Sequence, residues 1–436
     1  MTDSTTNRRG REPQPESSLL GGWRFMTGVS LSFVAVSIVG VAVPGIISAL
    51  AQTLNLSAEA AGLLGSASLW GLATGAIIAL PLSGRVPVKP TILILMTICA
   101  LTEIMCVFVQ SYNLLLIMQV VVGIAAGMTA STTGSLFARA QRVELLAGIT
   151  SAIQTGVASL AFFVLPIVVG VANMAGAWIF LGGCVAAAAI AIFFVFPPIA
   201  PVASTDTVET TRTGEVSRPW GVPAVLSIVS IFVFFVGTNA VYQFRVLQGM
   251  QNFGMTFESA NLALSVTVLF SIAGALVAGN IGVRRGRQLP VIVVGSVLVL
   301  SVVMLVGQAP AWMFWLATAL YQFSVTYIVI PWQEFQASLD ARGRPVVVAT
   351  FTGYVGIALG GSLGTFLVSR GTAPDGFVDY FPLTVVGVSC IGLGVILFLG
   401  GVVAWRSAAR GAGETSSGTK NEESNVLMPA LNERNA

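Results

Sequence analysis

The strongest constraint on this chain is the number of long apolar segments that it contains. A helix needs about 20 apolar residues to cross the hydrocarbon layer of a bilayer. Unpaired backbone groups are costly in lipid, and continuous apolar runs lack the alternation of barrel strands. The sequence therefore predicts an all-α polytopic membrane protein with twelve transmembrane helices. They lie near 25–50, 58–83, 90–109, 113–137, 146–171, 174–196, 221–245, 258–282, 289–307, 311–334, 346–369 and 381–405.

Composition excludes several classes of function. Hydrophobic residues make up 55% of the 436 residues and charged residues only 9%, against about 25% charged in an average soluble protein, which excludes a water-soluble enzyme. The chain has no histidine, and its four cysteines lie in apolar runs without CxxC spacing. We therefore expect no enzymatic activity, no metal site and no cofactor. The net charge of +3 gives no reason to expect a nucleic-acid partner.

The basic residues predict how the chain lies in the membrane. With the N-terminus inside, all 21 lysines and arginines except Arg245 and Arg370 fall on the inner side. Cytoplasmic loops carry such an excess of positive charge. The pattern therefore places both termini in the cytoplasm and the protein in the inner or plasma membrane of a cell.

The apolar segments divide into two halves. A polar stretch at 197–220 separates the sixth segment from the seventh and is typical of a cytoplasmic linker. At an offset of 199 residues, Glu59 falls on Glu258 and Gly75 on Gly274, which indicates an internal repeat. Two parallel six-helix repeats are a transporter architecture. We expect a cytoplasmic tail at 1–24, six-helix bundles at 25–196 and 221–405, and a disordered cytoplasmic tail at 406–436.

One loop motif carries a resemblance to a known family. The segment Gly279-Asn280-Ile281-Gly282-Val283-Arg284-Arg285-Gly286-Arg287 follows the eighth helix. It is similar to the G-x-x-x-D-R-x-G-R-[RK] loop of the major facilitator superfamily, with Val283 in place of the acid. The loop after the second helix keeps only Arg85 and Lys89. The resemblance covers about residues 25–405. It implies a gating role for the loop residues Arg85, Lys89, Arg284, Arg285 and Arg287.

The resemblance also implies that helices 1, 4, 7 and 10 line a central cavity. Three of these segments hold clustered polar side chains, which are costly in lipid and therefore face protein or water. The alternative is that they bond neighbouring helices or anchor the interface. Arg245 in a cavity would favour an anionic substrate, whereas at the helix end it could instead extend to the headgroups. The cavity candidates are Gln119, Asn239, Tyr242, Gln243, Arg245, Tyr321 and Gln322.

Two acids within the spans are candidates for proton coupling. Glu103 lies well inside the third apolar segment, where a carboxylate needs a proton or a partner. It could instead be a protonated group that bonds a neighbouring helix. Glu334 lies at the cytoplasmic end of the tenth segment and could instead form a salt bridge with a loop arginine.

Glycines at four-residue spacing mark places where helices approach closely. In the family, helices two and eleven face each other across the two halves, which predicts an interdomain seam. The alternative is static packing within one half. The seam candidates are Gly71, Gly75, Gly356, Gly360 and Gly364.

These observations predict a secondary active transporter of a small organic solute that works by alternating access. The chain has no GxxxxGK[ST] loop, so ATP is not expected to drive it. An organic anion is slightly favoured, and proton coupling is left open. The alternatives are efflux of neutral or amphipathic compounds and a sensor that moves no solute. We expect a monomer whose partners are the lipid bilayer and the small-molecule substrate, with protons as a further candidate partner.

Overall fold

The computed structural model describes residues 22–54, 56–82, 86–137, 143–197, 221–285, 288–339, 344–373 and 377–432. Nearly all of these residues are helical, and an isolated bridge between Thr372 and Val378 is the β pairing found among them. The helices are α2 (Trp23–Val41), α3 (Val43–Thr53), α4 (Ala58–Leu82), α5 (Val88–Met105), η1 (Cys106–Phe108), α6 (Tyr112–Phe137), α7 (Val143–Val195), α8 (Val222–Tyr242), α9 (Arg245–Asn252), α10 (Phe257–Thr267), α11 (Phe270–Arg285), α12 (Gln288–Val303), α13 (Ala311–Leu339), α14 (Arg344–Gly371) and α15 (Phe381–Asn432).

The helices match the twelve apolar segments. Ten helical stretches among the described residues are long and apolar enough to cross a membrane. One of them, Gly148–Val195, contains two spans, because Ala172 and Asn173 leave the helical conformation. Asn173 has a φ of 51° and a ψ of −146°, far outside the right-handed helical region, so the helix is interrupted there. Gln288–Val303 is a shorter apolar helix that supplies the remaining span. The predicted all-α membrane fold is confirmed.

The first and seventh spans are each divided into two helices. α2 ends at Val41 and α3 begins at Val43, with Pro44 in its first turn; proline cannot donate a backbone hydrogen bond and is tolerated at a helix start. α8 ends at Tyr242 and α9 begins at Arg245. No proline or glycine lies at this second break. The two breaks occupy equivalent places in the two halves of the chain.

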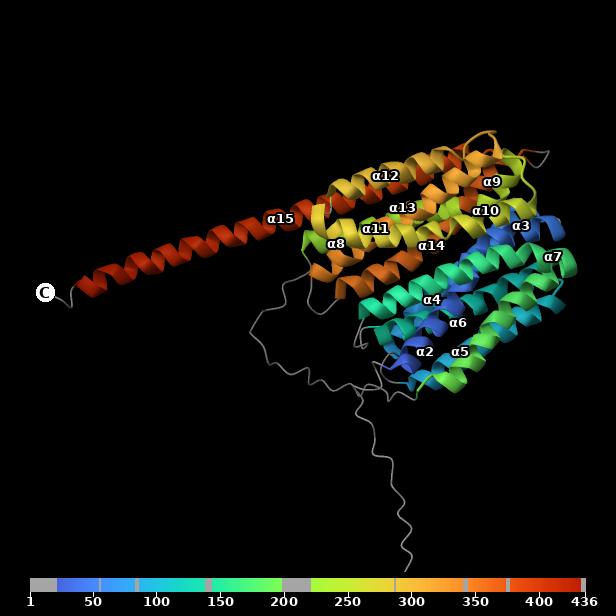
Figure 1. The fold of residues 1–436 in the computed structure, drawn as a ribbon, viewed down its shortest axis with the longest axis horizontal. Coiled ribbons are helices and arrows are strands. Elements are labelled where there is room, and N and C mark those ends of the chain that lie inside the picture. The colour runs from blue at the N-terminus through green and yellow to red at the C-terminus, as the bar shows by residue number, and fades with distance from the viewer. Residues whose placement is uncertain are drawn as a thin grey trace, which may run out of the picture.

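The helices pack in two groups that meet along their sides (Figure 1). α2 and α4 to α7 pack with one another in the lower part of the view, and α8 and α11 to α15 pack in the upper part. α4 contacts α14, and α7 contacts α10, between the groups. At one end of the bundle α3 also contacts α9. Helices from the two halves of the sequence therefore face each other along the length of the molecule.

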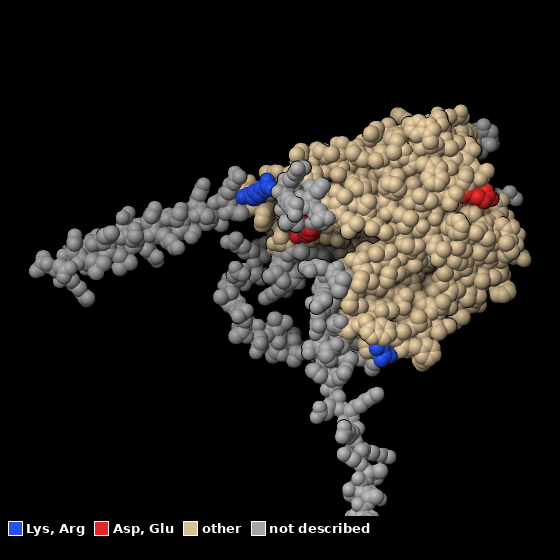
Figure 2. All heavy atoms as spheres, in the orientation of Figure 1, with Lys and Arg blue, Asp and Glu red and all other residues tan. Residues whose placement is uncertain are grey.

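Exposed charged side chains lie toward the two ends of the bundle. Figure 2 shows a broad band without charge on the face in view, with blue and red residues only toward its ends. Arg24 and Lys89 lie at one end, where both donate to carbonyl oxygens at the end of α7. The exposed large side chains between the ends are apolar, such as Ile94, Ile117 and Leu276. This distribution is typical of a surface that faces lipid.

The backbone of α15 continues as helix beyond the last predicted span. It projects away from the bundle to Asn432 (Figure 1), through the segment that the sequence predicts to be a disordered tail. A helix that packs on nothing is held by its own propensity alone and is marginal in water. The disorder of this tail stays a prediction.

Candidate functional site

The break in the seventh span gathers polar side chains inside the protein. Tyr242 ends α8, Gln243 and Phe244 form the break, and Arg245 begins α9. Gln243 and Arg245 have no exposed surface. Arg245 therefore does not extend to the headgroup layer, which was the alternative that the sequence left open for it.

Arg245 is a buried cation without a hydrogen-bond partner. Its Nε, Nη1 and Nη2 atoms all lack a partner among the described residues. Its guanidinium carbon lies 3.5 Å from the centre of the Tyr321 ring, so the aromatic face is its principal contact. No described acid forms an ion pair with it. The edges of the guanidinium are therefore free to bind an acceptor.

Two tyrosines support this cation. The rings of Tyr242 and Tyr321 stack with centres 6.4 Å apart and planes inclined by 11°. Tyr321 donates from Oη to the carbonyl oxygen of Thr238 at 2.7 Å, and Tyr242 donates to that of Val41 at 3.3 Å. The second bond joins the break of α8 and α9 to the break of α2 and α3. The arginine therefore lies where the two broken helices meet.

Asn239 and Gln243 bind the neighbouring helix α14. Asn239 donates from Nδ2 to the carbonyl oxygen of Ile357 at 2.7 Å. Gln243 donates from Nε2 to that of Gly361 at 2.6 Å and to Oγ1 of Thr365 at 3.0 Å. Their amide nitrogens thus serve as interhelical contacts, while Oε1 of Gln243 is buried and has no partner in the part of the chain that the structure describes. Gln322 is buried too, and its Nε2 has no partner among the described residues.

Gln119 lies in a separate cluster in the first half. It donates from Nε2 to Oε2 of Glu103 at 3.5 Å and to Sγ of Cys106 at 3.9 Å. Glu103 is fully buried on α5, and its Oε1 has no partner among the described residues. The structure gives no contact between this cluster and Arg245, although the sequence groups Gln119 with the other cavity candidates.

Sequence reasoning missed Gln248. This side chain is fully buried, and both of its amide atoms lack a partner in the described part of the chain. It follows Arg245 by three residues and therefore lies on the same face of α9. That spacing was the signal that could have identified it. Asn261 of α10 was also missed; it is buried, and its Oδ1 accepts no hydrogen bond from any described residue.

The predicted glycine seam between the halves is wrong. A Cβ atom at Gly71 or Gly75 would meet the backbone of α6, in the same half. Gly356, Gly360 and Gly364 likewise face the backbone of α8. Four-residue spacing lets two helices approach closely, but it does not specify which neighbour approaches. The contact of α4 with α14 instead includes Leu69, Ala73 and Ala358, which form a small apolar cluster.

The structure describes the side chains of only some of the predicted gating residues. Lys89 donates from Nζ to the carbonyl oxygens of Phe193 and Phe196, and so caps the end of α7 in its own half. Glu334 is half-buried near the end of α13. Arg85 and Arg287 lie outside the described residues. Arg284 and Arg285 belong to the end of α11, and their side chains also lie outside what the structure describes.

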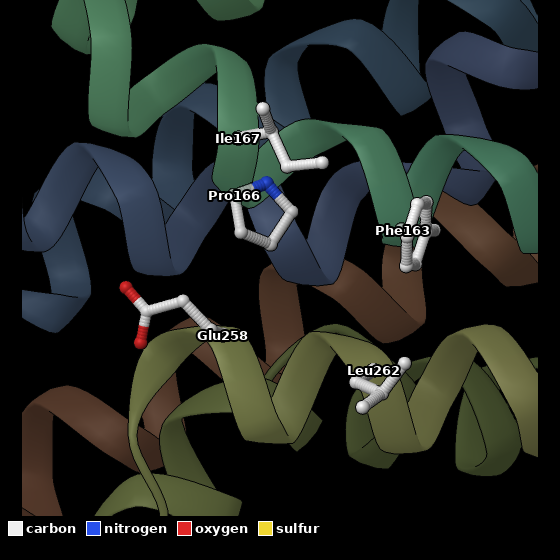
Figure 3. Close-up of a pocket in the computed structure, with 5 residues that line it drawn as sticks. All are labelled: Phe163, Pro166, Ile167, Glu258 and Leu262. Atoms are coloured by element: carbon white, nitrogen blue, oxygen red, sulfur yellow. The ribbon is translucent and has the colours of Figure 1, made fainter.

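A surface cavity lies elsewhere, between α7 and α10. It is a groove of about 200 Å³ lined by Phe163, Pro166, Ile167, Glu258 and Leu262. Figure 3 shows Phe163 and Leu262 at one end and the Glu258 carboxylate at the other. The groove is apolar apart from this acid, and none of the sequence-predicted site residues lines it. We therefore assign the candidate site to the buried polar cluster around Arg245.

The helical fold agrees with comparisons to known proteins. A family model described as Major Facilitator Superfamily matches residues 25–361. The chain belongs to the Major Facilitator Superfamily. The family consists of membrane transport proteins, so this chain is an integral membrane protein with a secondary-transporter fold. A search of curated protein sequences gives no significant match.

Solved structures share this fold at low sequence identity. A D-xylose-proton symporter aligns with a TM-score of 0.67 and 14% identity, over 86% of this chain and 96% of the other. The nucleoside transporter NupG aligns with a TM-score of 0.63 and 16% identity, over 88% and 99%. A bacterial homologue of the human lysosomal transporter Spinster, inward-facing and unoccupied, aligns with a TM-score of 0.63 and 14% identity, over 92% and 98%. At these identities the likeness concerns the fold alone.

Proposed function

We propose that this superfamily member is a secondary transporter that binds a small organic anion at Arg245 and moves it by alternating access. The two six-helix halves, 25–196 and 221–405, tilt as bodies about the site. The solved structures named for nucleosides and D-xylose support a small organic solute. The anion is supported by this chain's own arginine.

The single observation that carries the proposal is the unpaired guanidinium. An ion buried without a partner costs several kcal/mol in desolvation. A carboxylate or phosphate could accept in-plane hydrogen bonds from Nε and Nη atoms while Tyr321 covers one face. Gln248 and Gln322 offer further buried amide donors. The substrate thereby supplies the countercharge that the described protein residues do not.

The position of the site suits alternating access. Tyr242, from the second half, donates to Val41, in the first half, at the level of the two helix breaks. A solute bound beside Arg245 would contact both halves at the level of the two helix breaks, as in carriers with discontinuous helices. Binding there can therefore change the relative stability of the two tilted states.

We also propose that both termini face the cytoplasm of a cell whose inner or plasma membrane holds the protein as a monomer. The end of the bundle with Arg24, Lys89 and Arg406 is the cytoplasmic end by the positive-inside rule. Glu59 and Glu258 begin their helices at the opposite end. Glu334 remains a proposed gate contact.

Ligand binding by the purified protein tests the anion proposal. A panel of carboxylates, phosphorylated compounds and neutral solutes is screened by thermal shift, since a ligand of the folded state raises its melting temperature. We expect an anion to stabilise the wild type and Arg245→Gln to lower its affinity about ten- to hundredfold, from the loss of charge-assisted hydrogen bonds. Arg370→Gln is the matched control, because Arg370 also lies over an aromatic ring, Phe366, but is exposed.

Three results would contradict parts of this proposal. Stabilisation by neutral or amphipathic compounds alone would favour the exporter alternative. An anion affinity unchanged in Arg245→Gln would remove the arginine from the site. Binding without saturable counterflow in liposomes would indicate a sensor and not a carrier.

A further inference from the structure

Glu103 is a fully buried carboxyl group that the anion site does not use. It lies on α5, within the membrane-spanning stretch Val88–Phe108. Oε2 accepts one long hydrogen bond, from Gln119 at 3.5 Å, and Oε1 has no partner among the described residues. An ionised carboxylate with so little compensation costs several kcal/mol in an apolar interior.

The groups that face Glu103 provide no positive charge. Its own helix and the turn after it present the thiols of Cys99 and Cys106. α6 presents the amide of Gln119, and α7 presents Gly182, at which a Cβ would lie 3.2 Å from that of Glu103. No described lysine or arginine pairs with the carboxyl group. In this conformation a proton is therefore the available means of neutralising it.

A small cavity with a mostly apolar lining adjoins the Gln119 side chain. It measures about 10 Å³, which is about the space that one water molecule needs. Gln119 and Ser68 supply its polar lining. Ser68 donates to the carbonyl oxygen of Gly65 at 2.8 Å, so its oxygen can still accept a bond from water. Gln119 thus links the carboxyl group to a site that can hold water.

The same cavity adjoins the break in the first span. Val39 and Val43, which line it, lie on either side of that break. The carbonyl oxygen of Val41, between them, accepts the hydrogen bond from Tyr242 of the other half. Movement of the first span would therefore reshape the cavity and the contact between the halves together.

We propose that Glu103 is an exchangeable proton-binding site. A water molecule between Gln119 and Ser68 would lie close to it. Movement of the first span couples this site to the contact between the two halves. The O–H bond of the carboxylic acid breaks, the proton passes to water, and the carboxylate remains; no electrons are transferred. When the halves separate at Val41 and Tyr242, water reaches the carboxyl group and the proton leaves. This proposal rests on the proposed transport function in one respect: the proton bound at Glu103 would be the ion that drives transport.

Infrared spectroscopy of the protein in phosphatidylcholine vesicles, without any substrate, tests this site. We expect the wild type to show the carbonyl stretch of a protonated carboxyl group, which disappears as the pH is raised. Glu103→Gln should lack this band, whereas Glu258→Gln, which changes an exposed acid, should keep it.

Exchange into heavy water tests the role of the cavity. In the wild type the band should shift after transfer to D₂O, and in Ser68→Val, which removes a polar wall, the shift should be at least tenfold slower. A band that persists in Glu103→Gln, or that does not titrate while the protein stays folded, overturns the proposal. So does an exchange rate unchanged by Ser68→Val. Because no solute is added, these results stand whether or not an anion binds at Arg245.

Discussion

At the scale of single residues, the chemistry of this protein concentrates on one buried arginine. A desolvated cation–π contact is worth about 2 kcal/mol, which is less than the several kcal/mol that burial of an unpaired charge costs. Tyr321 thus offsets part of the cost of burying Arg245 and holds its position. The remaining imbalance is the physical basis of the anion binding proposed at Arg245.

The ring of Tyr321, and not its hydroxyl group, should matter for binding. Tyr321→Leu removes the aromatic face that lies 3.5 Å from the guanidinium carbon, and we expect about fivefold weaker anion binding, equivalent to about 1 kcal/mol. Tyr321→Phe keeps the ring and loses only the bond to Thr238; it should lower stability by about 1 kcal/mol with affinity retained. Thermal-shift titration measures both, and equal affinities in the two variants would contradict the stacking role.

At the scale of helices, glycine stripes make each half a tightly packed body. A Cβ atom at Gly75 would collide with the carbonyl oxygen of Ile124, on α6, and one at Gly360 with that of Val236, on α8. Backbone atoms cannot rotate away as a side chain can. These helix pairs are therefore expected to stay together while the halves move.

A substitution of a glycine between two such helices should lower the stability of the protein more than it changes the movement of the two halves. Gly75→Ala should lower the melting temperature in detergent by several degrees, because α4 and α6 must separate to admit the methyl group. Gly156→Ala is the matched control, since no atom lies within 4 Å of its Cβ position; it should be neutral or stabilising by about 0.5–1 kcal/mol, since glycine is a poor helix former. Similar losses in both variants would contradict this packing.

At the scale of the whole molecule, hydrogen bonds between the halves run from the middle of the bundle toward the end with α3 and α9. Tyr242 bonds Val41, Trp70 bonds Ser362 at 2.8 Å, and Gln52 donates to Sδ of Met250 at 3.3 Å. α3 and α9 also contact each other there. If the termini face the cytoplasm, as proposed above, this conformation is closed toward the outside.

Gly361 permits this closure. A Cβ atom there would lie 2.7 Å from Oε1 of Gln243 and 3.2 Å from atoms of Leu69 and Ser66 in the opposite half. Gln243 cannot swing aside freely because its Nε2 binds α14. Gly361→Ala should therefore shift the population away from the closed state.

Cross-linking measures this shift. Cysteines replace Gln52 and Met250 in a chain whose four native cysteines are changed to alanine, and we expect Gly361→Ala to reduce the cross-linking yield severalfold. Gly40→Ala is the control, because its Cβ would make only an ordinary contact at 3.8 Å with Leu69. An undiminished yield in Gly361→Ala would show that the halves close without this glycine.

Some candidate site residues could be predicted because a charged side chain in an apolar span can be accommodated in only a few ways. An arginine or a carboxylate inside an apolar run must find protein or water, so Arg245 and Glu103 are recognisable in the sequence. Gln119 is different. Its amide could face the centre of the bundle or the third span, and only packing placed it 3.5 Å from Glu103. Gln248 was not predicted because the sequence of the short polar helix α9 has the pattern of a solvent-exposed loop.

The sequence by itself determined the number, the helical nature and the expected orientation of the spans. Each segment interacts with lipid separately, so its apolar length and flanking charges are enough to predict whether it spans the membrane and in which direction. The tertiary structure decided which surfaces meet: Gly75 with α6, Gly361 with the opposite half, and Arg245 with Tyr321. These contacts depend on how each helix is rotated about its axis, and in an apolar solvent that rotation is set by side-chain packing between helices, which no single segment specifies.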